Sequence, residues 1–326
     1  MSVNTSLPKL YSAEILHPEA LDFLAGKVEL TGPNRRPLEG EDISPYLKDA
    51  EGLINPYFTV NASFLEMAPR LRVVSNVSVG YNNLDVEELK KRGILATHTP
   101  GVMSTSVADL ILCLMTACCR RAAELDKAVR CGEWTNDTFL KWFGTDISGA
   151  KLGILGCGRI GRVLAKKAKA GFDMDVAYFN RHRDLEAEET LGIRFETRDE
   201  LLRSSDFVVV LTPLNAETWH SIGAREFDLM KEDAVFINTA RGSLVDEAEL
   251  IRALKEGKIR AAGLDCLEQE PTYPENELLK MRNVIVTPHI GSSTYATRKA
   301  MVMMACRAAV EALYGGKPSC TIPEMK

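Results

Sequence analysis

This 326-residue sequence predicts an α/β protein with two doubly wound parallel-sheet domains. Strand-like and helix-like runs alternate from residue 9 to about residue 99, and a second alternating series begins at Lys151. A glycine-rich turn opens the second series, and a helical pattern at 294–313 follows that series. Because this last helix can return to the first sheet, we expect a discontinuous first domain. Residues 1–101 and 292–326 then form one domain, and residues 102–291 form the domain inserted in it.

The first series predicts a small, flavodoxin-like parallel sheet with helices on both faces. Its strand-like runs are 10–13, 28–31, 52–54, 71–77 and 94–98, and its helical patterns are 18–26, 43–48, 62–68 and 85–92. Pro100-Gly101 ends this series. A long helix is expected over 104–130, followed by a loop or short helices at 131–149.

The second series begins with the turn Gly156-Cys157-Gly158-Arg159-Ile160-Gly161, which lies between an apolar run and a helical pattern. Gly156 can adopt the angles of a tight turn, Gly158 leaves room for a pyrophosphate, and Gly161 lets helix and strand pack closely. The start of the helix favours an anion. Further strands are expected at 176–179, 207–211, 234–238, 261–265 and 284–286. The sequence therefore predicts a six-stranded Rossmann domain that binds a dinucleotide, with an ordinary glycine-rich turn as the alternative.

Composition excludes several other classes of protein. The net charge of -5 and the lack of a basic block argue against nucleic acid or an anionic membrane as a partner. The apolar run at 110–119 is too short to span a bilayer, and residues 1–9 lack the pattern of a signal peptide, so we expect a cytoplasmic protein. The eight cysteines form no CxxC pair and lie at no ligand spacing from a histidine, which indicates buried reduced thiols and no metal site.

The residues after the second strand of this domain indicate which dinucleotide binds. In NAD sites an acidic residue about twenty positions past the glycines binds the adenosine ribose, but here the chain reads Asn180-Arg181-His182-Arg183. Asn180 does not repel a 2′-phosphate, and Arg181 and Arg183 can bind one. We therefore expect NADPH, with NADH possible but less favoured. The alternative is a solvated basic turn that does not distinguish the two.

Three loops that follow strands of the second series carry the reactive residue types. Arg241 has a planar guanidinium that matches a carboxylate, and His289 titrates near neutral pH and can protonate an oxygen. Glu270 can keep that imidazole protonated. Because strand ends of a doubly wound sheet face one crevice, these residues can converge to reduce a 2-oxo acid. Each also has a structural alternative: a surface ion pair, a solvated loop position or a helix cap.

Over essentially its whole length the chain resembles the D-isomer-specific 2-hydroxyacid dehydrogenases. The blocks that carry this resemblance are Val77 to Asn83, the glycine turn, Asn238 to Asp246, Gly263 to Pro271 and Thr287 to Ser293. The resemblance implies that Arg241, Glu270 and His289 are the catalytic trio.

Further site residues follow from the same resemblance. It implies that backbone N–H groups of Ser78, Val79 and Gly80 bind the substrate carboxylate together with Arg241 and His289. The implied coenzyme set is Thr105, Gly156, Gly158, Arg159, Ile160, Gly161, Asn180, Arg181, Arg183, Thr212, Pro213, Thr239, Ala240 and Asp265, the last facing the nicotinamide amide.

The surroundings of Asn180 and the length of the chain look most like glyoxylate/hydroxypyruvate reductases and 2-ketogluconate reductases. The resemblance also implies a homodimer formed through residues 104–130. Trp142 and Phe143 either contact substrate, if need be in a neighbouring subunit, or pack in the fold. A dinucleotide-sensing corepressor or an inactive structural subunit is the competing class of function, because a fold does not determine an activity.

Overall fold

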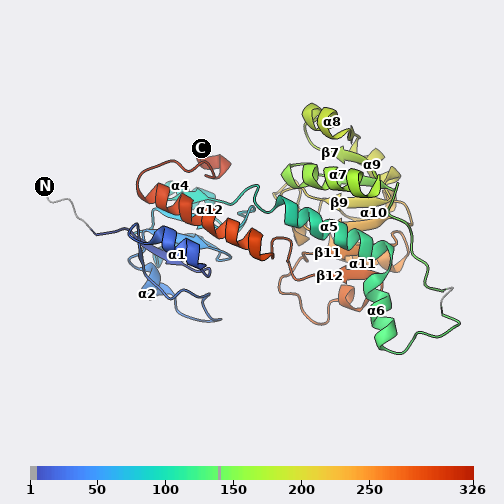
Figure 1. Cartoon of the computed structure of the whole chain (residues 1–326), viewed down its shortest axis with the longest axis horizontal. Helices are drawn as coiled ribbons and strands as arrows, with labels where there is room; N and C mark the ends of the chain where they lie inside the picture. The colour runs from blue at the N-terminus through green and yellow to red at the C-terminus, as the bar shows by residue number, and fades with distance from the viewer. Residues whose placement is uncertain (1–5, 139–140) are drawn as a thin grey trace. The chain divides into compact units, whose positions relative to one another are not determined.

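The computed structural model describes residues 6–138 and 141–326, which form two compact units. The first unit comprises Met1–Met103 and Thr294–Lys326, and the second comprises Ser104–Ser293. Residues 1–5, where no signal peptide is expected, and residues 139–140 of the expected loop lie outside the described part (Figure 1).

The first unit contains a five-stranded parallel sheet in the order β2-β1-β3-β4-β5, the flavodoxin-like order that the sequence predicts. Its strands are β1 (Lys9–Ser12), β2 (Glu29–Leu30), β3 (Gly52–Asn55), β4 (Val73–Asn76) and β5 (Leu95–Thr97). Its helices are α1 (Pro18–Leu24), α2 (Ser44–Leu47), α3 (Ala62–Glu66), α4 (Val86–Lys91) and α12 (Tyr295–Leu313), with a short 3-10 turn at Pro323–Met325.

An apolar core lies on each face of this sheet. Leu53 and Ile54 are neighbours on β3 and point to opposite faces, as successive strand residues do. Leu53 belongs to a core with Phe64 of α3, and Ile54 belongs to a core with Met301 of α12. The last helix, α12, therefore completes a sheet built by the first third of the chain, and it packs beside α1 (Figure 1).

The second unit contains a parallel sheet of seven strands in the order β12-β11-β10-β9-β6-β7-β8, with β6 at the position where the Rossmann order reverses. The strands are β6 (Lys151–Leu155), β7 (Asp175–Phe179), β8 (Arg194–Phe195), β9 (Phe207–Val210), β10 (Val235–Asn238), β11 (Ala261–Leu264) and β12 (Val284–Val286). The Rossmann fold is confirmed, but the predicted count of six strands is wrong. The missed strand, β8, has two residues and an exposed arginine, so it lacks the apolar run that marks a strand in sequence.

The helices of the second unit are α5 (Ser104–Cys119), α6 (Ala122–Arg130), α7 (Arg159–Phe172), α8 (Leu185–Leu191), α9 (Arg198–Ser204), α10 (Ala224–Leu229) and α11 (Glu247–Lys255), with 3-10 turns at Gly242–Leu244 and Glu277–Lys280. The prediction of a single helix over 104–130 is wrong, because the helix is interrupted between α5 and α6. Arg121 there has a left-handed φ of 56°. The apolar pattern continues across the break, which hides it from sequence periodicity.

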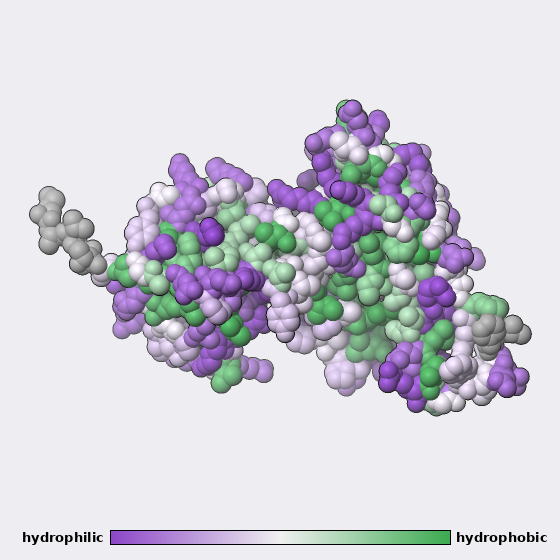
Figure 2. Space-filling model, viewed as in Figure 1, coloured by the Kyte–Doolittle hydropathy of each residue, from purple (hydrophilic) through white to green (hydrophobic). Residues whose placement is uncertain are grey.

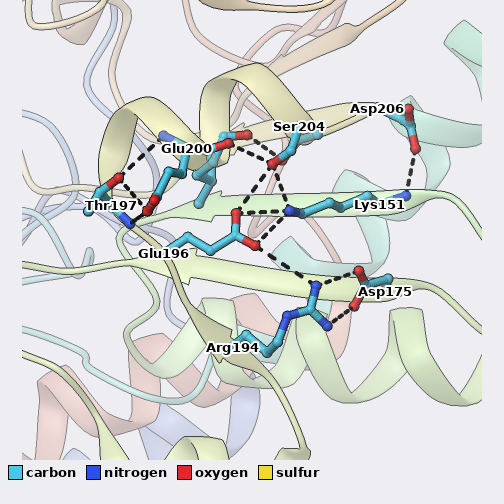
Figure 3. Close-up of polar contacts among 10 residues, drawn as sticks. Lys151, Asp175, Arg194, Glu196, Thr197, Glu200, Ser204 and Asp206 are labelled. Atoms are coloured by element: carbon cyan, nitrogen blue, oxygen red, sulfur yellow. Dashed lines mark hydrogen bonds and ion pairs between the residues drawn. The ribbon is translucent and has the colours of Figure 1, made fainter.

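A network of ion pairs links the elements at the amino-terminal edge of this sheet (Figure 3). The ammonium of Lys151 lies 2.6 and 2.8 Å from the two carboxylate oxygens of Glu196. Its main-chain N–H donates to Asp206 at 2.7 Å, and Arg194 forms a bidentate pair with Asp175 at 2.6 Å. The start of β6 is thereby tied to β8 and to the start of β9, at the end of the sheet opposite the glycine turn.

The structure also shows which cysteines are buried and whether any helix could span a membrane. All eight cysteines lie in the described residues as free thiols, and five are buried, whereas Cys113 and Cys131 are exposed. Burial raises the pKa of Cys157, inside the glycine turn, to about 12. Of the helices in the described residues, none is long and apolar enough to cross a membrane.

Candidate active site

The glycine turn joins β6 to α7 and packs tightly against the loop that follows β9. Gly156 has a φ of 94°, and a Cβ at this position would lie 2.6 Å from the backbone nitrogen of Thr212. Only glycine suits both the conformation and this approach. Thr212 and Pro213, predicted at the adenosine end, therefore begin a loop that lies directly beside the turn.

Room for an anion remains at the start of α7. A Cβ at Gly158 would meet nothing within 4 Å, and Gly158 caps the helix without any side-chain hydrogen bond. Gly161 instead packs inward, with its Cβ position 3.2 Å from Cys157 Sγ. The N–H groups of Arg159 and Ile160, in the first turn, thus lie where a helix favours phosphate. The turn fits the diphosphate of a dinucleotide.

Asn180, Arg181 and Arg183 differ in how strongly each is bound by other residues of the chain. Asn180 accepts from the N–H of Cys157 at 2.7 Å and donates to its carbonyl at 3.2 Å, so it supports the glycine turn. Arg183 forms a bidentate pair with Glu188 at 2.7 and 2.6 Å. Arg181 has one contact at 3.3 Å with Glu217, and both of these side chains are about three-quarters exposed. Such a pair is weak, so Arg181 is the arginine better able to bind a ligand.

The loop that carries Arg241 follows β10 and is held from within by Asn238, the buried last residue of that strand. Asn238 donates to the carbonyl of Arg241 at 2.9 Å and accepts from the N–H of Ala240 at 3.0 Å. Arg241 donates to the Ala240 carbonyl at 2.6 Å. Thr239 in the same loop has a buried hydroxyl with no hydrogen-bond partner among the described residues. Because a buried polar atom without a partner is costly, Thr239 fits a contact to a bound coenzyme.

Gly242 brings the Arg241 loop against the loop that follows β11. A Cβ at Gly242 would lie 1.9 Å from the carbonyl oxygen of Leu267 and 2.3 Å from the backbone nitrogen of Glu268. Both contacts are with backbone, which no side-chain movement relieves. The absence of a side chain at Gly242 therefore allows Arg241 to lie close to the segment that carries Glu270.

The turn that carries His289 is held by Asp265. This buried carboxylate accepts from the hydroxyl of Thr287 at 2.5 Å and from the N–H groups of Ile290 and Gly291 at 2.8 Å each. His289 itself has a left-handed φ of 52°. In this structure Asp265 fixes the backbone on both sides of the histidine. The first turn of α5, which contains Thr105, lies next to the same loop, because Val107 is 3.3 Å from the Cβ position of Gly291.

His289 and Glu270 form the central contact of the site. The distance from His289 Nδ1 to Glu270 Oε2 is 2.7 Å, and Glu270 Oε1 accepts from the N–H of Leu267 at 3.1 Å. The hydrogen bond that His289 donates to Glu270, together with the charge of that carboxylate, raises the pKa of His289 more than burial and the charge of Arg241 lower it. Burial is the largest single effect on Glu270 and would raise its pKa, but the hydrogen bond and charge of His289, the N–H of Leu267 and the charge of Arg241 together lower that pKa. The arrangement favours an imidazolium paired with a carboxylate.

In the first unit, the backbone after β4 presents three N–H groups in a row. The carbonyl of Ser78 accepts from the N–H of Thr99 at 2.8 Å, and that of Val79 is bound by His98 Nδ1 at 2.9 Å. The carbonyl of Gly80 accepts from the Ser78 hydroxyl at 2.5 Å and from the Asn76 amide at 3.2 Å. The N–H groups of Ser78, Val79 and Gly80 meet no acceptor within residues 6–138 and 141–326. A run of unpaired N–H groups is a binding site for an anion such as a carboxylate.

Sequence reasoning missed the residues that shape these loops: Asn76, Asn238 and Gly242. Both asparagines are buried and stand last in an otherwise apolar strand, β4 and β10 respectively. A polar residue at the carboxyl end of a buried strand was the available signal, because a buried amide needs partners in the next loop. Gly242 carried no signal, since its close neighbour is 25 positions away in the chain.

Trp142 and Phe143 are the two aromatic residues for which the sequence leaves both substrate contact and packing open. Trp142 is half-buried and Phe143 is exposed in the segment before β6. No group of three or more histidine, cysteine, aspartate or glutamate side chains in the described part of the chain is arranged to hold a metal ion.

Comparison with known proteins identifies the family. Residues 112–291 match the family described as D-isomer specific 2-hydroxyacid dehydrogenase, NAD binding domain. The chain belongs to the D-isomer specific 2-hydroxyacid dehydrogenase family. As a 2-hydroxyacid dehydrogenase it is an oxidoreductase, and the matched region covers the glycine turn and the trio.

Similar dehydrogenases cover nearly the whole chain. Glyoxylate/hydroxypyruvate reductase B from Citrobacter koseri is 42% identical over 326 residues, which is 100% of this chain and 99% of the relative. The protein of the same name from Escherichia coli K12 is 44% identical over 293 residues, 90% of each chain. Among solved structures, the NADPH-dependent glyoxylate/hydroxypyruvate reductase from Sinorhizobium meliloti, in complex with NADP and malonate, is 29% identical, covers 98% of both chains and has a TM-score of 0.84.

Proposed function

We propose that this protein reduces a small 2-oxo acid, of the glyoxylate, hydroxypyruvate or 2-ketogluconate type, to the D-2-hydroxy acid with NADPH. The 2.7 Å contact between His289 and Glu270, with Arg241 in the adjoining loop, is the observation that supports turnover. An imidazole whose pKa a neighbouring carboxylate raises is typical of a catalytic site. Two relatives that cover nearly the whole chain are named glyoxylate/hydroxypyruvate reductase B, which supports the choice of substrates.

Each residue of the trio has a separate task in this proposal. Because Glu270 engages Nδ1 of His289, Nε2 is the nitrogen that gives its proton to the C2 oxygen of the substrate. Glu270 keeps the ring in this orientation and stabilises its charged form. Arg241 binds the substrate carboxylate and polarises the carbonyl. The N–H groups of Ser78, Val79 and Gly80 bind the same carboxylate. When bound, the reduced nicotinamide supplies the hydride that C2 accepts.

The preference for NADPH follows from the chain after β7. No carboxylate occupies the place of Asn180, and Arg181 has a weak, exposed partner that a 2′-phosphate can replace. Arg183 is held by two short bonds to Glu188, so we assign the phosphate to Arg181 first. A structural relative from Sinorhizobium meliloti is NADPH-dependent by name, which agrees with this assignment.

One set of assays tests both the reaction and the coenzyme. The oxidation of NADPH and of NADH is followed by absorbance with glyoxylate, hydroxypyruvate and 2-ketogluconate, for the wild type, Arg181→Ala and Arg183→Ala. We expect the wild type to prefer NADPH. Arg181→Ala should raise KM for NADPH about tenfold or more, the worth of one charge-assisted hydrogen bond, and leave KM for NADH unchanged. Arg183→Ala is the matched control and should change KM for NADPH less.

Three results of these assays would contradict parts of the proposal. A wild-type preference for NADH would refute the coenzyme assignment. Equal effects of the two arginine substitutions would refute the choice of Arg181. Failure to oxidise either coenzyme with any of the three acids would instead favour a sensing or scaffold role.

We also propose that the protein is a homodimer joined through the region of α5 and α6. Hydrophobic residues gather on the visible surface of the second unit where Figure 1 places the end of α5 and the start of α6 (Figure 2). A hollow of about 320 Å³ there has a mixed lining of apolar, charged and polar residues: Ala117, Cys118, Ala261, Ile285, Arg121, Arg260, Arg282, Glu124 and Asn283. Val129 on α6 and Trp134 just beyond it are exposed. Exposed large apolar side chains beside such a hollow are typical of a protein interface, and a second copy of the chain is the partner we assign.

A further inference from the structure

We propose that His98 is a positioning residue that orients the backbone N–H groups which bind the substrate carboxylate. The inference rests on the proposed function and adds a residue to it. His98 follows β5, and its Nδ1 lies 2.9 Å from the carbonyl oxygen of Val79. A carbonyl oxygen only accepts hydrogen bonds, so Nδ1 carries the proton in this contact.

The planarity of the peptide group connects this contact to the substrate. The carbonyl of Val79 and the N–H of Gly80 belong to one planar trans peptide and point in opposite directions. A bond that holds the carbonyl toward His98 therefore holds the Gly80 N–H away from it, where that N–H meets no acceptor in the part of the chain that the structure describes. A donor on the carbonyl also polarises the peptide and strengthens its N–H as a donor to an anion.

The neighbouring peptides are held in the same way, which makes His98 one of three supports. The N–H of Thr99, the next residue, binds the carbonyl of Ser78 at 2.8 Å. Asn76 and the Ser78 hydroxyl bind the carbonyl of Gly80. Of these three supports, His98 is the one that binds the peptide between Val79 and Gly80, and it does so through its side chain from the segment after β5.

The imidazole is itself fixed on two sides. The backbone N–H of His98 donates to the carbonyl of Cys320 at 3.0 Å, in the segment that follows α12. The ring of Tyr81 meets the imidazole edge to face, with 5.5 Å between ring centres, and the Tyr81 hydroxyl lies 3.1 Å from both carboxylate oxygens of Glu324. The C-terminal segment and Tyr81 thus restrict the imidazole to the orientation that reaches Val79.

The test compares His98→Leu, which removes the donor, with His98→Asn, whose side-chain N–H can take the place of Nδ1. For His98→Leu we expect KM for glyoxylate and hydroxypyruvate to rise roughly three- to tenfold, the loss of one hydrogen bond, with kcat within about twofold and KM for NADPH unchanged. His98→Asn should restore most of the affinity. His17→Leu is the matched control, because it removes a different imidazole of the same unit, one that caps α1.

Binding of oxalate, a dicarboxylate that cannot be reduced, separates this inference from the proposed function. Isothermal titration of the protein saturated with NADP⁺ should give a dissociation constant for oxalate that rises in His98→Leu by the same factor as KM. This measurement stands even if none of the tested acids is a substrate. An unchanged oxalate affinity in His98→Leu, a loss confined to kcat, or a His98→Asn variant as weak as His98→Leu would overturn the role of His98.

Discussion

His289 shows how one side chain acquires its chemistry from a neighbour 19 positions earlier in the chain. An isolated imidazole is mostly neutral at pH 7, and a neutral ring cannot donate the proton that reduction requires. Glu270 raises the pKa of His289, and the turn held by Asp265 places the ring against that carboxylate. In the proposed reaction, His289 is therefore prepared as an acid before any substrate binds.

This arrangement predicts the pH dependence of the reaction. In the proposed mechanism reduction needs protonated His289, so kcat/KM should be full at low pH and fall as the pH rises through the raised pKa of His289. Glu270→Gln removes the carboxylate that raises the pKa of His289, so the same fall in kcat/KM should begin at a lower pH.

A second substitution tests the proton donor itself. His289→Ala should lower kcat by about 10² to 10⁴ with the affinity for NADPH nearly unchanged.

The comparison of pH profiles gives a direct check. Steady-state rates of the wild type and Glu270→Gln are measured across the same pH range, and coenzyme affinity is measured by fluorescence titration. If the two profiles fall at the same pH, Glu270 does not set the pKa of His289. If His289→Ala keeps near-full activity, another group donates the proton.

At the scale of elements, the site is built by glycines that serve two different purposes. Gly156 and Gly242 let two loops touch, because a Cβ at either position would meet backbone atoms of another loop. Gly158 has open space around it, so packing within the chain does not require a glycine there. We infer that Gly158 leaves space for the diphosphate of the coenzyme.

A single substitution distinguishes these purposes. Gly158→Ala adds a methyl group that meets nothing in the chain. The melting temperature without coenzyme should therefore stay within about 2 °C of the wild type, which corresponds to a change in the free energy of unfolding of about 1 kcal/mol or less. Its dissociation constant for NADPH should rise about tenfold or more, because the methyl group occupies the space of the diphosphate. Gly171→Ala is the control: it lies in the same helix, is equally open, and should be neutral or slightly stabilising without any change in NADPH affinity. Unchanged NADPH binding in Gly158→Ala would place the diphosphate elsewhere.

At the scale of the whole molecule, the proposed dimer has a measurable size. Sedimentation equilibrium should give twice the chain mass of 36.0 kDa. Val129→Glu places a charge on the exposed apolar side of α6 and should shift the mass toward that of one chain on dilution. Leu38→Glu adds the same charge at an exposed leucine of the first unit and should leave the mass unchanged. A wild-type mass of 36.0 kDa at micromolar concentration would rule the dimer out.

Much of the fold and the candidate site can be predicted from local patterns. The alternation of apolar runs and the glycine turn depend on residues close together in the chain, which the sequence displays directly, and the family resemblance adds Arg241, Glu270 and His289 as the candidate trio. A two-residue strand such as β8 and a helix break inside a continuous apolar pattern, as at Arg121, leave no such local trace.

By itself, then, the sequence determined the class of fold, the turn that receives a dinucleotide and the residue types available for chemistry. Only the tertiary structure decided which partners those residues have: Asn180 supports the glycine turn, Glu188 pairs with Arg183, and Glu270 pairs with His289. The physical reason is that a hydrogen bond depends on distances of about 3 Å between atoms, and it joins residues that are far apart in the chain, as Cys157 and Asn180 are at 23 positions. No periodicity or spacing along the chain encodes such a distance.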